Sequence, residues 1–394
     1  MDILNIIGRE CPLFSEDLLK YEDELTSVTR GNSFLVIGGG GSIGQAVSKE
    51  LFARGAKSLH IVDTNENYLV ELVRDIRSSL GYRTKCFDTF ALDCGDPEYE
   101  KFFKRGKYDY VLNLSAMKHV RSENDAFSMY RMLKTNMFNT LSTYEYATNY
   151  GAKKYFCVST DKAANPANFM GATKRAMEIS LMRSSNALAM SGARFANVAF
   201  SNGSLLQGFE FRLQKIQPLS VPSDVRRFFV TAKEAGIICL FSTLLGARHE
   251  IFFPYNQQEI SLRRFTDIAH NFLRSVGKEG VECSSEDEAR ELINSIDLDK
   301  YWPINIFKTD TVGEKAFEEF YTSSEQVNFG KFKDLASVKF ESDISGSEIL
   351  SFKAAVQQID LQKSGAKFEL IALISQFVPS FKHVYSEKTL NMKM

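Results

Sequence analysis

Short apolar runs alternate with stretches of helical periodicity through the first half of the chain. The runs at residues 34–37 and 59–62 are continuous, as in strands that are buried on both faces of a sheet. Each is followed by apolar positions spaced three or four residues apart, and similar runs recur at 86–92, 110–114 and 155–158. Strands that alternate with helices predict an α/β fold built on a doubly wound parallel sheet.

The alternation loosens after residue 200, which divides the chain into regions. Leucines among acidic residues predict a helix before the first strand, and apolar helical stretches recur near the end of the chain. The regions that we expect are a helical N-terminal extension at 1–30, a parallel-sheet domain at 31–200 with a returning segment at 230–256, a smaller C-terminal domain at 201–229 and 257–330, and a helical C-terminal region at 331–394.

Composition and charge narrow the possible functions. The chain has 394 residues, about two domains' worth, and its 48 basic and 49 acidic residues give no electrostatic case for binding nucleic acid or an acidic membrane. The most apolar windows, 235–247 and 368–381, are shorter than the roughly 18 apolar residues that span a bilayer. The start lacks a signal-peptide layout, and neither the six cysteines nor the histidines have metal-ligand spacing. We therefore expect a cytoplasmic protein with reduced thiols, no membrane span and no metal.

A glycine-rich turn follows the first predicted strand and opens the next helix. Gly38 can take the tight turn, Gly41 lets the backbone approach a pyrophosphate, and Gly44 permits close packing of helix on strand. The N–H groups that open the helix, at Ser42 and Ile43, would bind phosphate charge together with the helix dipole. This spacing predicts a dinucleotide-binding site in the parallel-sheet domain.

An acidic residue at the end of the second strand indicates which dinucleotide is bound. Asp63 lies 25 residues after the first glycine of the turn, where its carboxylate would accept hydrogen bonds from ribose hydroxyls and repel a 2′-phosphate. Thr64 and Asn65 follow it without an arginine, so NAD is predicted rather than NADP. Asp93, with its neighbour Cys94, ends the third strand where adenine would lie, although an ordinary turn residue is the alternative.

A second cluster of polar side chains follows the strand predicted at 155–158. Thr160, Asp161 and Lys162 come directly after it, and Met170 and Lys174 lie four residues apart, on one face of the next helix. The segment supplies a hydroxyl, an acid and two amines within fifteen positions. Without the glycine turn, the acid and amine would be interpreted as a solvated turn pair.

Together the glycine spacing GxxGxxG, the Thr-Asp-Lys segment and MxxxK resemble the extended short-chain dehydrogenase/reductases. Within them the chain resembles the UDP-N-acetylglucosamine 4,6-dehydratases of bacterial surface polysaccharide and nonulosonate biosynthesis. The resemblance is weaker before residue 31 and after about residue 330, and KHVR and NLSA depart from the usual family forms. The matching segments are GGGGSIG (38–44), NLSAMKHV (113–120), KTN (134–136), STDKAANPANFMGATKR (159–175), RFANVAFSNGS (194–204), DVRRFF (224–229) and GEK (313–315).

The resemblance implies an acid–base set for the loss of water across C5 and C6 of a hexose. Oxidation at C4 first makes the C5 proton acidic, and the hydride later returns to C6, so NAD can stay bound. Lys162 would be the base, since positive charge on the nicotinamide and on Lys174 favours its neutral amine. Asp161 would protonate the C6 hydroxyl, Thr160 would touch the C4 oxygen, and Lys174 would bind the nicotinamide ribose. Met170 replaces the usual tyrosine, as in a subgroup that resembles enzymes retaining the C5 configuration.

The same resemblance assigns further positions to the cofactor and to the substrate. The smaller domain then becomes the substrate-binding domain, and Arg227 suits a diphosphate because its guanidinium is a planar fork. The additional cofactor positions are Ser115, Ala116, Lys118 and Thr135, and the substrate positions are Lys118, His119, Asn197, Ser201, Asn202, Gly203, Ser204 and Arg227.

Three questions stay open at this stage. A nucleotide-sugar C4 epimerase or 4-ketoreductase on the same fold is one alternative, although such enzymes need a tyrosine at position 170 and no Asp-Lys pair. A non-catalytic NAD-binding protein is another, although it would not need Lys162 or Lys174. The substrate is expected to be a UDP-sugar, with a GDP-sugar as the alternative, and the resemblance implies a homo-oligomer of unknown size.

Overall fold

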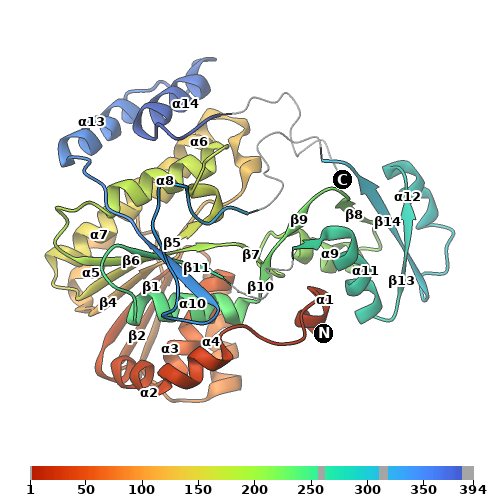
Figure 1. Ribbon diagram of the computed structural model, residues 1–394, viewed down its shortest axis with the longest axis horizontal. Coiled ribbons are helices and arrows are strands. Elements are labelled where there is room, and N and C mark those ends of the chain that lie inside the picture. Colours follow the sequence, from red (N-terminus) through yellow and green to blue (C-terminus); the bar gives the residue numbers. More distant parts are fainter. Residues whose placement is uncertain (1, 256–261, 310–317, 384–394) are drawn as a thin grey trace.

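The computed structural model describes residues 2–255, 262–309 and 318–383. Its largest element is a nine-stranded sheet in which the seven strands from β11 to β3 run parallel and an antiparallel pair extends one edge (Figure 1). In spatial order the strands are β15 (Val327–Asn328), β16 (Leu335–Lys339), β11 (Glu250–Pro254), β6 (Ala189–Phe195), β5 (Lys154–Thr160), β4 (Tyr110–Asn113), β1 (Ser33–Ile37), β2 (Ser58–Asp63) and β3 (Cys86–Ala91). The prediction of a doubly wound parallel sheet is confirmed.

Helices cover both faces of this sheet, which explains why its inner strands are continuous apolar runs. All five residues of β1 are buried. One face carries α2 (Ser15–Gly31), α3 (Ser42–Ala53), α4 (Glu66–Leu80) and α10 (Ala232–Leu244). The other face carries α5 (Glu98–Gly106), α6 (Ala126–Leu133), η2 (Lys134–Phe138), α7 (Asn139–Asn149) and α8 (Phe169–Leu181).

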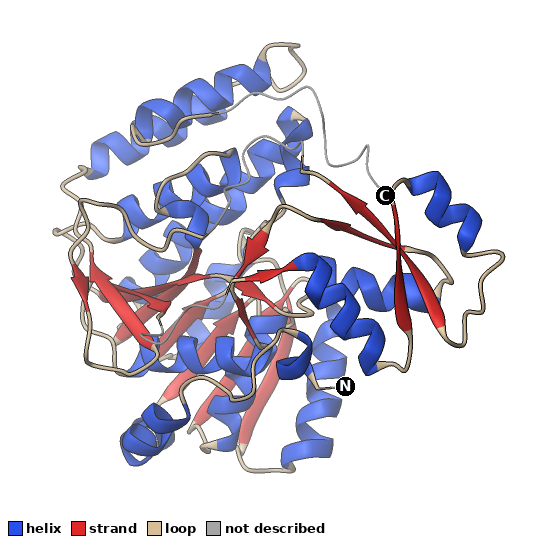
Figure 2. Ribbon diagram, turned by 45° about the vertical axis from the view of Figure 1, so that its right-hand side comes forward, coloured by secondary structure: helices blue, strands red, loops and turns tan. Residues whose placement is uncertain are grey.

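A smaller domain lies beyond the carboxyl ends of the parallel strands, as Figures 1 and 2 show. It has its own core, to which the N-terminal residues Ile6 and Ile7 belong. Its elements are α1 (Ile3–Ile6), α9 (Leu205–Gln214), α11 (Phe265–Ser275), α12 (Glu286–Leu292) and the parallel sheet β13 (Glu279–Cys283), β14 (Tyr301–Phe307) and β8 (Leu219–Pro222). There are also two short strand pairs, a parallel pair of β7 (Asn197–Val198) with β10 (Phe229–Val230) and an antiparallel pair of β9 (Arg226–Arg227) with β12 (Arg263–Arg264).

The C-terminal region is not helical throughout, which corrects the expectation for residues 331–394. Strand β16 begins at Leu335 and pairs antiparallel with β11. Its apolar side chains pack into the main core. Helices α13 (Gly346–Gln357) and α14 (Ala366–Phe377) follow, and α14 packs on α6 and α8. The matched GEK segment and the end of the chain from residue 384 lie outside the described residues. The domain boundaries themselves remain a prediction.

A cluster of buried charges connects the elements on which the rest of the site depends. Arg194 on β6 is fully buried and binds two carboxylates, Glu178 on α8 at 2.8 Å and Glu325 at 2.7 Å. Arg175 joins both carboxylates, which balances the charge of the cluster. Burial alone raises the pKa of Glu178, but the charges of Arg194 and Arg175 and the hydrogen bonds from Arg194 and Ser159 together outweigh it and lower that pKa to about 2. Ser159 donates a hydrogen bond to Glu178 at 2.6 Å, so the cluster also holds the end of β5.

Replacing the central arginine should destabilise the protein strongly. Arg194→Met removes one of the two arginines and leaves two buried carboxylates with Arg175 alone to balance them, so we expect a loss of about 3–5 kcal/mol in the free energy of unfolding. The matched control is Arg290→Met, because Arg290 pairs with Glu286 and Asp287 on an exposed helix face. It should cost less than about 1 kcal/mol. Urea denaturation measures both, and equal effects would contradict this role of the cluster.

Candidate active site

A cavity of about 670 Å³ lies between the two domains, at the carboxyl ends of β1, β2, β4 and β5. This is where ligands bind in open α/β sheets, because the strand order reverses there. Of the residues predicted from the sequence, those in the cavity wall are Gly38, Gly41, Ser42, Ile43, Gly44, Asp63, Thr64, Asn65, Ala116, Lys118, His119, Thr160, Asp161, Lys162, Met170, Lys174, Asn197, Ser201, Asn202, Gly203 and Ser204.

At two of the three spaced glycines in the turn, any larger residue would clash with the neighbouring backbone. Gly38 has φ +75°, and an added Cβ would lie 2.6 Å from the backbone nitrogen of Ser115. A Cβ on Gly44 would lie 2.3 Å from the Gly38 carbonyl oxygen. At Gly41, which caps α3, a Cβ would meet only that oxygen, at an ordinary 3.5 Å. The chain's own packing therefore requires glycine at 38 and 44, and Gly41 leaves the helix start open to a bound group.

Asp63 fixes the turn against the end of β2. Its Oδ2 accepts a hydrogen bond from the Gly40 backbone at 2.9 Å, and its Oδ1 accepts one from the Asn65 backbone at 2.9 Å. Asn65 in turn caps α4 by accepting from Tyr68. The carboxylate thus aligns the glycine turn while it lines the cavity.

Thr160, Asp161 and Lys162 form one hydrogen-bonded group at the end of β5. The Thr160 hydroxyl donates to Asp161 Oδ1 at 2.6 Å, and Lys162 Nζ lies 3.2 Å from the same oxygen. The strand passes here into a short turn, η3 (Asp161–Ala163), so successive side chains gather at one point. The Asp161 side chain is 9% exposed and that of Lys162 is 28% exposed, so the amine is the more accessible of the two from the cavity. The arrangement places an acid and an amine within proton-transfer distance.

Helix α8 carries the other two members of the predicted set. Lys174 is buried and donates from Nζ to the carbonyl oxygen of Val158 at 3.1 Å, and burial lowers its pKa to about 8. Met170 is buried one turn earlier in the same wall. The start of the helix is fixed by Glu123, which accepts hydrogen bonds from the backbone of Phe169 at 3.1 Å and of Met170 at 2.9 Å.

Neither Glu123 nor a second positioning residue, Asn136, was identified from the sequence. Asn136 is fully buried in η2, where its side chain makes two hydrogen bonds to the backbone of Met117, at 2.8 and 2.9 Å, and one to Thr173 at 2.9 Å. It ties the loop after β4 to α8. The KTN match pointed to this segment, but the prediction fell on the neighbouring Thr135.

The loop at 201–204 closes one side of the cavity. The Asn202 backbone donates to the Ser42 hydroxyl at 2.9 Å, which joins the smaller domain to the start of α3. Gly203 has φ +73°, and an added Cβ would lie 2.7 Å from the imidazole of His119. Ser204 caps α9 by accepting from Gln207, so its hydroxyl has a structural role in addition to its place in the wall.

Five predicted site residues lie outside the cavity wall: Asp93, Cys94, Ser115, Thr135 and Arg227. Asp93 accepts a hydrogen bond from the Gly95 backbone at 2.8 Å, as a turn residue does. Cys94 is buried, which raises its pKa to about 12. Ser115 lies against Gly38, and Thr135 contributes its carbonyl to Thr140 inside a helix. Their proposed direct contacts with cofactor or substrate have no support from the cavity geometry.

Arg227 instead faces a buried acid that the sequence analysis missed. Glu318 Oε1 lies 3.8 Å from Arg227 and accepts hydrogen bonds from the side chain of Asn197 at 2.6 Å and the backbone of Phe228 at 3.2 Å. Burial raises the pKa of Glu318 to about 7, with the Arg227 charge opposing and the Asp161 charge adding to this shift. The only signal in the sequence was an acidic pair shortly after the GEK segment.

The family is established by comparison with known proteins. A family model described as "Polysaccharide biosynthesis protein" matches residues 34–339. The match covers most of the chain and both domains around the cavity. The chain therefore belongs to this polysaccharide biosynthesis family. Among the helices of the described residues, none has the length and apolar character needed to cross a bilayer.

The curated proteins that are similar to this chain are described as having different activities. The chain is 31% identical to the uncharacterized membrane protein MJ1061 of Methanocaldococcus jannaschii over 58% of this chain and 68% of that protein. It is 26% identical to the capsular polysaccharide biosynthesis protein CapD of Staphylococcus aureus over 76% of this chain, and it spans only 50% of CapD. It is 25% identical to an inverting UDP-N-acetylglucosamine 4,6-dehydratase of Campylobacter jejuni, over 68% of this chain and 78% of that protein. A UDP-glucose 4-epimerase of Rickettsia massiliae is similarly related, at 27% identity over 77% of this chain and 94% of that protein.

Solved structures share the fold. Pen from Bacillus thuringiensis superimposes with a TM-score of 0.61 and 21% identity over 80% of this chain and 87% of that chain. DesIV from Streptomyces venezuelae, a dTDP-glucose 4,6-dehydratase with NAD and TYD bound, has a TM-score of 0.55 and 16% identity over 73% of this chain and 88% of that chain. These similarities establish the extended Rossmann-like fold with its smaller C-terminal domain.

The raised pKa of Glu318 gives a testable pH dependence of stability. Between its ordinary value of 4.5 and about 7, the folded chain keeps a proton that the unfolded chain releases. The stability from this group is therefore present below about pH 4.5 and falls as pH rises towards 7, by at most about 3 kcal/mol. Glu318→Gln keeps a neutral side chain, so the variant should match the parent near pH 4 and exceed its stability near pH 8.

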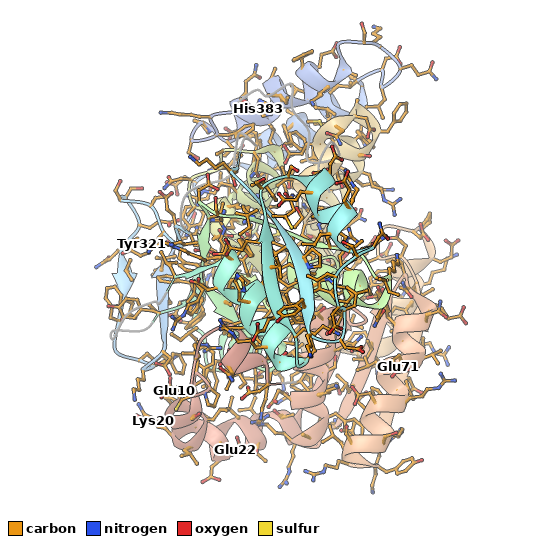
Figure 3. All side chains as sticks on the ribbon, turned by 90° about the vertical axis from the view of Figure 1, so that its right-hand side faces the viewer. Glu10, Lys20, Glu22, Glu71, Tyr321 and His383 are labelled. Atoms are coloured by element: carbon orange, nitrogen blue, oxygen red, sulfur yellow. The ribbon has the colours of Figure 1, made fainter. Side chains whose placement is uncertain are left out.

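Thermal unfolding at a series of pH values measures this difference. The matched control is Glu71→Gln on α4, since Glu71 lies on the surface in Figure 3 and is exposed. Its Tm difference from the parent should not change with pH. A Glu318→Gln curve parallel to that of the parent would show that the pKa of Glu318 is the same in the folded and unfolded chains, and would contradict the raised pKa.

Proposed function

We propose that this protein is an NAD-dependent nucleotide-sugar 4,6-dehydratase that converts UDP-N-acetylglucosamine to its 4-keto-6-deoxy derivative with the C5 configuration retained. The product would serve surface polysaccharide or nonulosonate biosynthesis. One observation carries the proposal: Thr160, Asp161 and Lys162 are linked by hydrogen bonds in the wall of the cavity that also contains the glycine turn. The family and the similarity to a UDP-N-acetylglucosamine 4,6-dehydratase support it.

The hydrogen-bond donors and acceptors in the cavity wall suit NAD. The start of α3 is sterically open at Gly41, the Asp63 carboxylate is in the wall where a ribose would lie, and the Lys174 amine is near the end of β5. When bound, NAD would take a hydride from C4 and return it to C6, so that the net redox change is zero. The description of DesIV with NAD bound, on a similar fold, supports this assignment.

Lys162 and Asp161 would carry out the proton transfers. Once C4 is a ketone, Lys162 can take the C5 proton, and Asp161 can donate a proton to the C6 hydroxyl, which leaves as water. The proton that the C4 hydroxyl loses on oxidation would reach Asp161 through the Thr160 hydroxyl, which lies 2.6 Å from Asp161 Oδ1. Lys162 would keep the C5 proton and return it to C5 after the hydride has reached C6, so the net loss is one water. Thr160, already bonded to Asp161, would hold the C4 oxygen.

Met170 determines the proposed stereochemistry. A thioether has no proton to exchange, so reprotonation of C5 falls to Lys162, which removed the proton from the same face. Configuration at C5 is then kept. The dehydratase from Campylobacter jejuni is described as inverting, so this chain is proposed to differ from that relative in the face of protonation.

A nucleotide-sugar C4 epimerase or 4-ketoreductase is the rival within the family, given the similarity to a UDP-glucose 4-epimerase. Such reactions lose no water, so they have no step for a joined Asp161–Lys162 pair. A non-catalytic NAD-binding protein would need neither side chain. The choice of UDP over GDP, the homo-oligomer and the cytoplasmic location inferred from the sequence remain part of the proposal.

The proposed function is tested by incubating the purified protein with UDP-N-acetylglucosamine and no added cofactor. Mass spectrometry should detect a product lighter by one water, because NAD that is regenerated in each cycle can stay bound during purification. A product of unchanged mass would indicate epimerisation. No product with either UDP-linked or GDP-linked sugars would overturn the assignment as an enzyme of this class.

Removing the proposed base should stop the loss of water without emptying the cofactor site. Lys162→Met keeps the bulk of the side chain but removes the amine, so turnover should fall by at least about 10²-fold while bound dinucleotide is unchanged. The matched control is Lys153→Met, since Lys153 is an exposed lysine just before β5. It should keep its activity. Activity of Lys162→Met within about tenfold of the parent would exclude Lys162 as the base.

Turnover in deuterated water tests the role of Met170. A base with exchangeable amine protons should place solvent deuterium at C5 on the face from which the proton left. Proton NMR of the fresh product should therefore give the 4-keto-6-deoxy sugar with its C5 configuration kept. Signals of the C5-inverted sugar as the first product would contradict retention, and a different proton donor would have to be sought near Met170.

A further inference from the structure

Three metal-binding side chains meet on one face of the main sheet, at the edge opposite the antiparallel pair. His60 on β2 lies directly across from Asp88 on the edge strand β3, and Cys86 precedes Asp88 by two residues. Residues two apart on a strand point to the same face. The pairing of β2 with β3 therefore brings an imidazole, a thiol and a carboxylate together.

The three donor atoms form a compact triangle. His60 Nε2 lies 3.6 Å from Cys86 Sγ and 3.6 Å from Asp88 Oδ2, and Sγ and Oδ2 are 4.0 Å apart. Zinc binds sulfur at about 2.3 Å and nitrogen or oxygen at about 2.0 Å with tetrahedral angles, which requires donor–donor separations of about 3.3–3.6 Å. The triangle thus meets one face of a zinc tetrahedron after movements of a few tenths of an ångström.

A buried tyrosine orients the imidazole for this purpose. His60 Nδ1 lies 2.9 Å from the Tyr108 hydroxyl, and Tyr108 is 4% exposed. A hydroxyl oxygen can accept a hydrogen bond from Nδ1–H, the tautomer that leaves the Nε2 lone pair for a cation. Burial also lowers the pKa of His60, which favours the neutral ring that metals bind. Metal-binding histidines are typically held by such a contact through their other nitrogen.

We propose that His60, Cys86 and Asp88 form a binding site for a thiophilic divalent cation, with zinc the best fit and water at the fourth position. The site is separate from the candidate active site. None of its three residues is in the cavity wall, and His60 precedes Asp63 by three strand residues, or about 10 Å. A bound cation would join the edge strand β3 to β2 and stabilise the edge of the sheet behind the dinucleotide site.

The sequence contains no motif for this site, because its donors are 26 residues apart and meet only through strand register. The thiol of this site, Cys86, also differs from the four buried thiols of the described residues. Cys86 is exposed and so open to a cation, whereas the other exposed cysteine, Cys11, belongs to no group of three potential ligands among the described residues. Cys11 is therefore a natural control for non-specific thiol binding.

Cobalt(II) titration of the purified, chelator-treated protein tests the proposal. One equivalent of cobalt should produce a thiolate-to-cobalt charge-transfer absorption, which zinc should then displace. The absorption should be lost in Cys86→Ser and kept in Cys11→Ser. Because Cys86 is exposed, its substitution should leave the fold intact, as circular dichroism can verify. Absence of the absorption in the parent, or its persistence in Cys86→Ser, would overturn the site.

A second variant tests the positioning role of Tyr108. Tyr108→Phe keeps the buried ring but removes the hydroxyl, so zinc affinity measured by calorimetry should fall by about 10–100-fold while the cobalt absorption is still reached at saturation. Zinc should also raise the Tm of the parent and of Cys11→Ser but not that of Cys86→Ser. Equal zinc affinity in the parent and Tyr108→Phe would contradict this orientation of His60.

Discussion

The buried contact between Arg194 and two carboxylates is the interaction on which the site depends. Arg194 lies on β6, Glu178 on α8 and Glu325 in the segment after the smaller domain, so the three charges fix parts of the chain that are distant in sequence. Charges withdrawn from water are costly unless each has its partner, which favours arrangements of these elements that keep the charges paired. Through Ser159 the cluster is also hydrogen-bonded to the last part of β5. The candidate catalytic residues Thr160, Asp161 and Lys162 follow Ser159 directly.

At and beside the cavity, burial shifts the pKa values of two titratable side chains. Lys174 has a lowered pKa because it is buried, and Glu318 has a raised one for the same reason. Asp161 and Lys162 instead contact each other, with 3.2 Å between Asp161 Oδ1 and Lys162 Nζ. A buried amine, the Asp161–Lys162 contact and a buried acid bonded to Asn197 thus lie at or beside one cavity.

The sequence predicts those parts of the molecule that depend on local pattern. Apolar runs such as the one within β1 identified the parallel sheet, and the glycine spacing identified the turn at Gly38 and Gly44, because backbone geometry there depends on neighbouring residues. Strand β16 was missed since its pairing with β11 joins residues about 85 apart along the chain. Glu123, Asn136 and Glu318 were missed because each acts on a segment far away in the sequence. Asp93 Oδ1 accepts a hydrogen bond in its own turn, and the Thr135 carbonyl accepts one inside a helix, while their contacts with the cofactor stay predictions.

In the proposed reaction, the hydride removed from C4 of the sugar is the one that returns to C6. UDP-N-acetylglucosamine carrying deuterium at C4 is the substrate with which this transfer can be measured. We expect a product that has lost one water and carries the label at C6, transferred within one molecule without exchange. Label retained at C4 in a product of unchanged mass would identify an epimerase. A substrate recovered with neither change, from protein that binds NAD, would contradict the catalytic account.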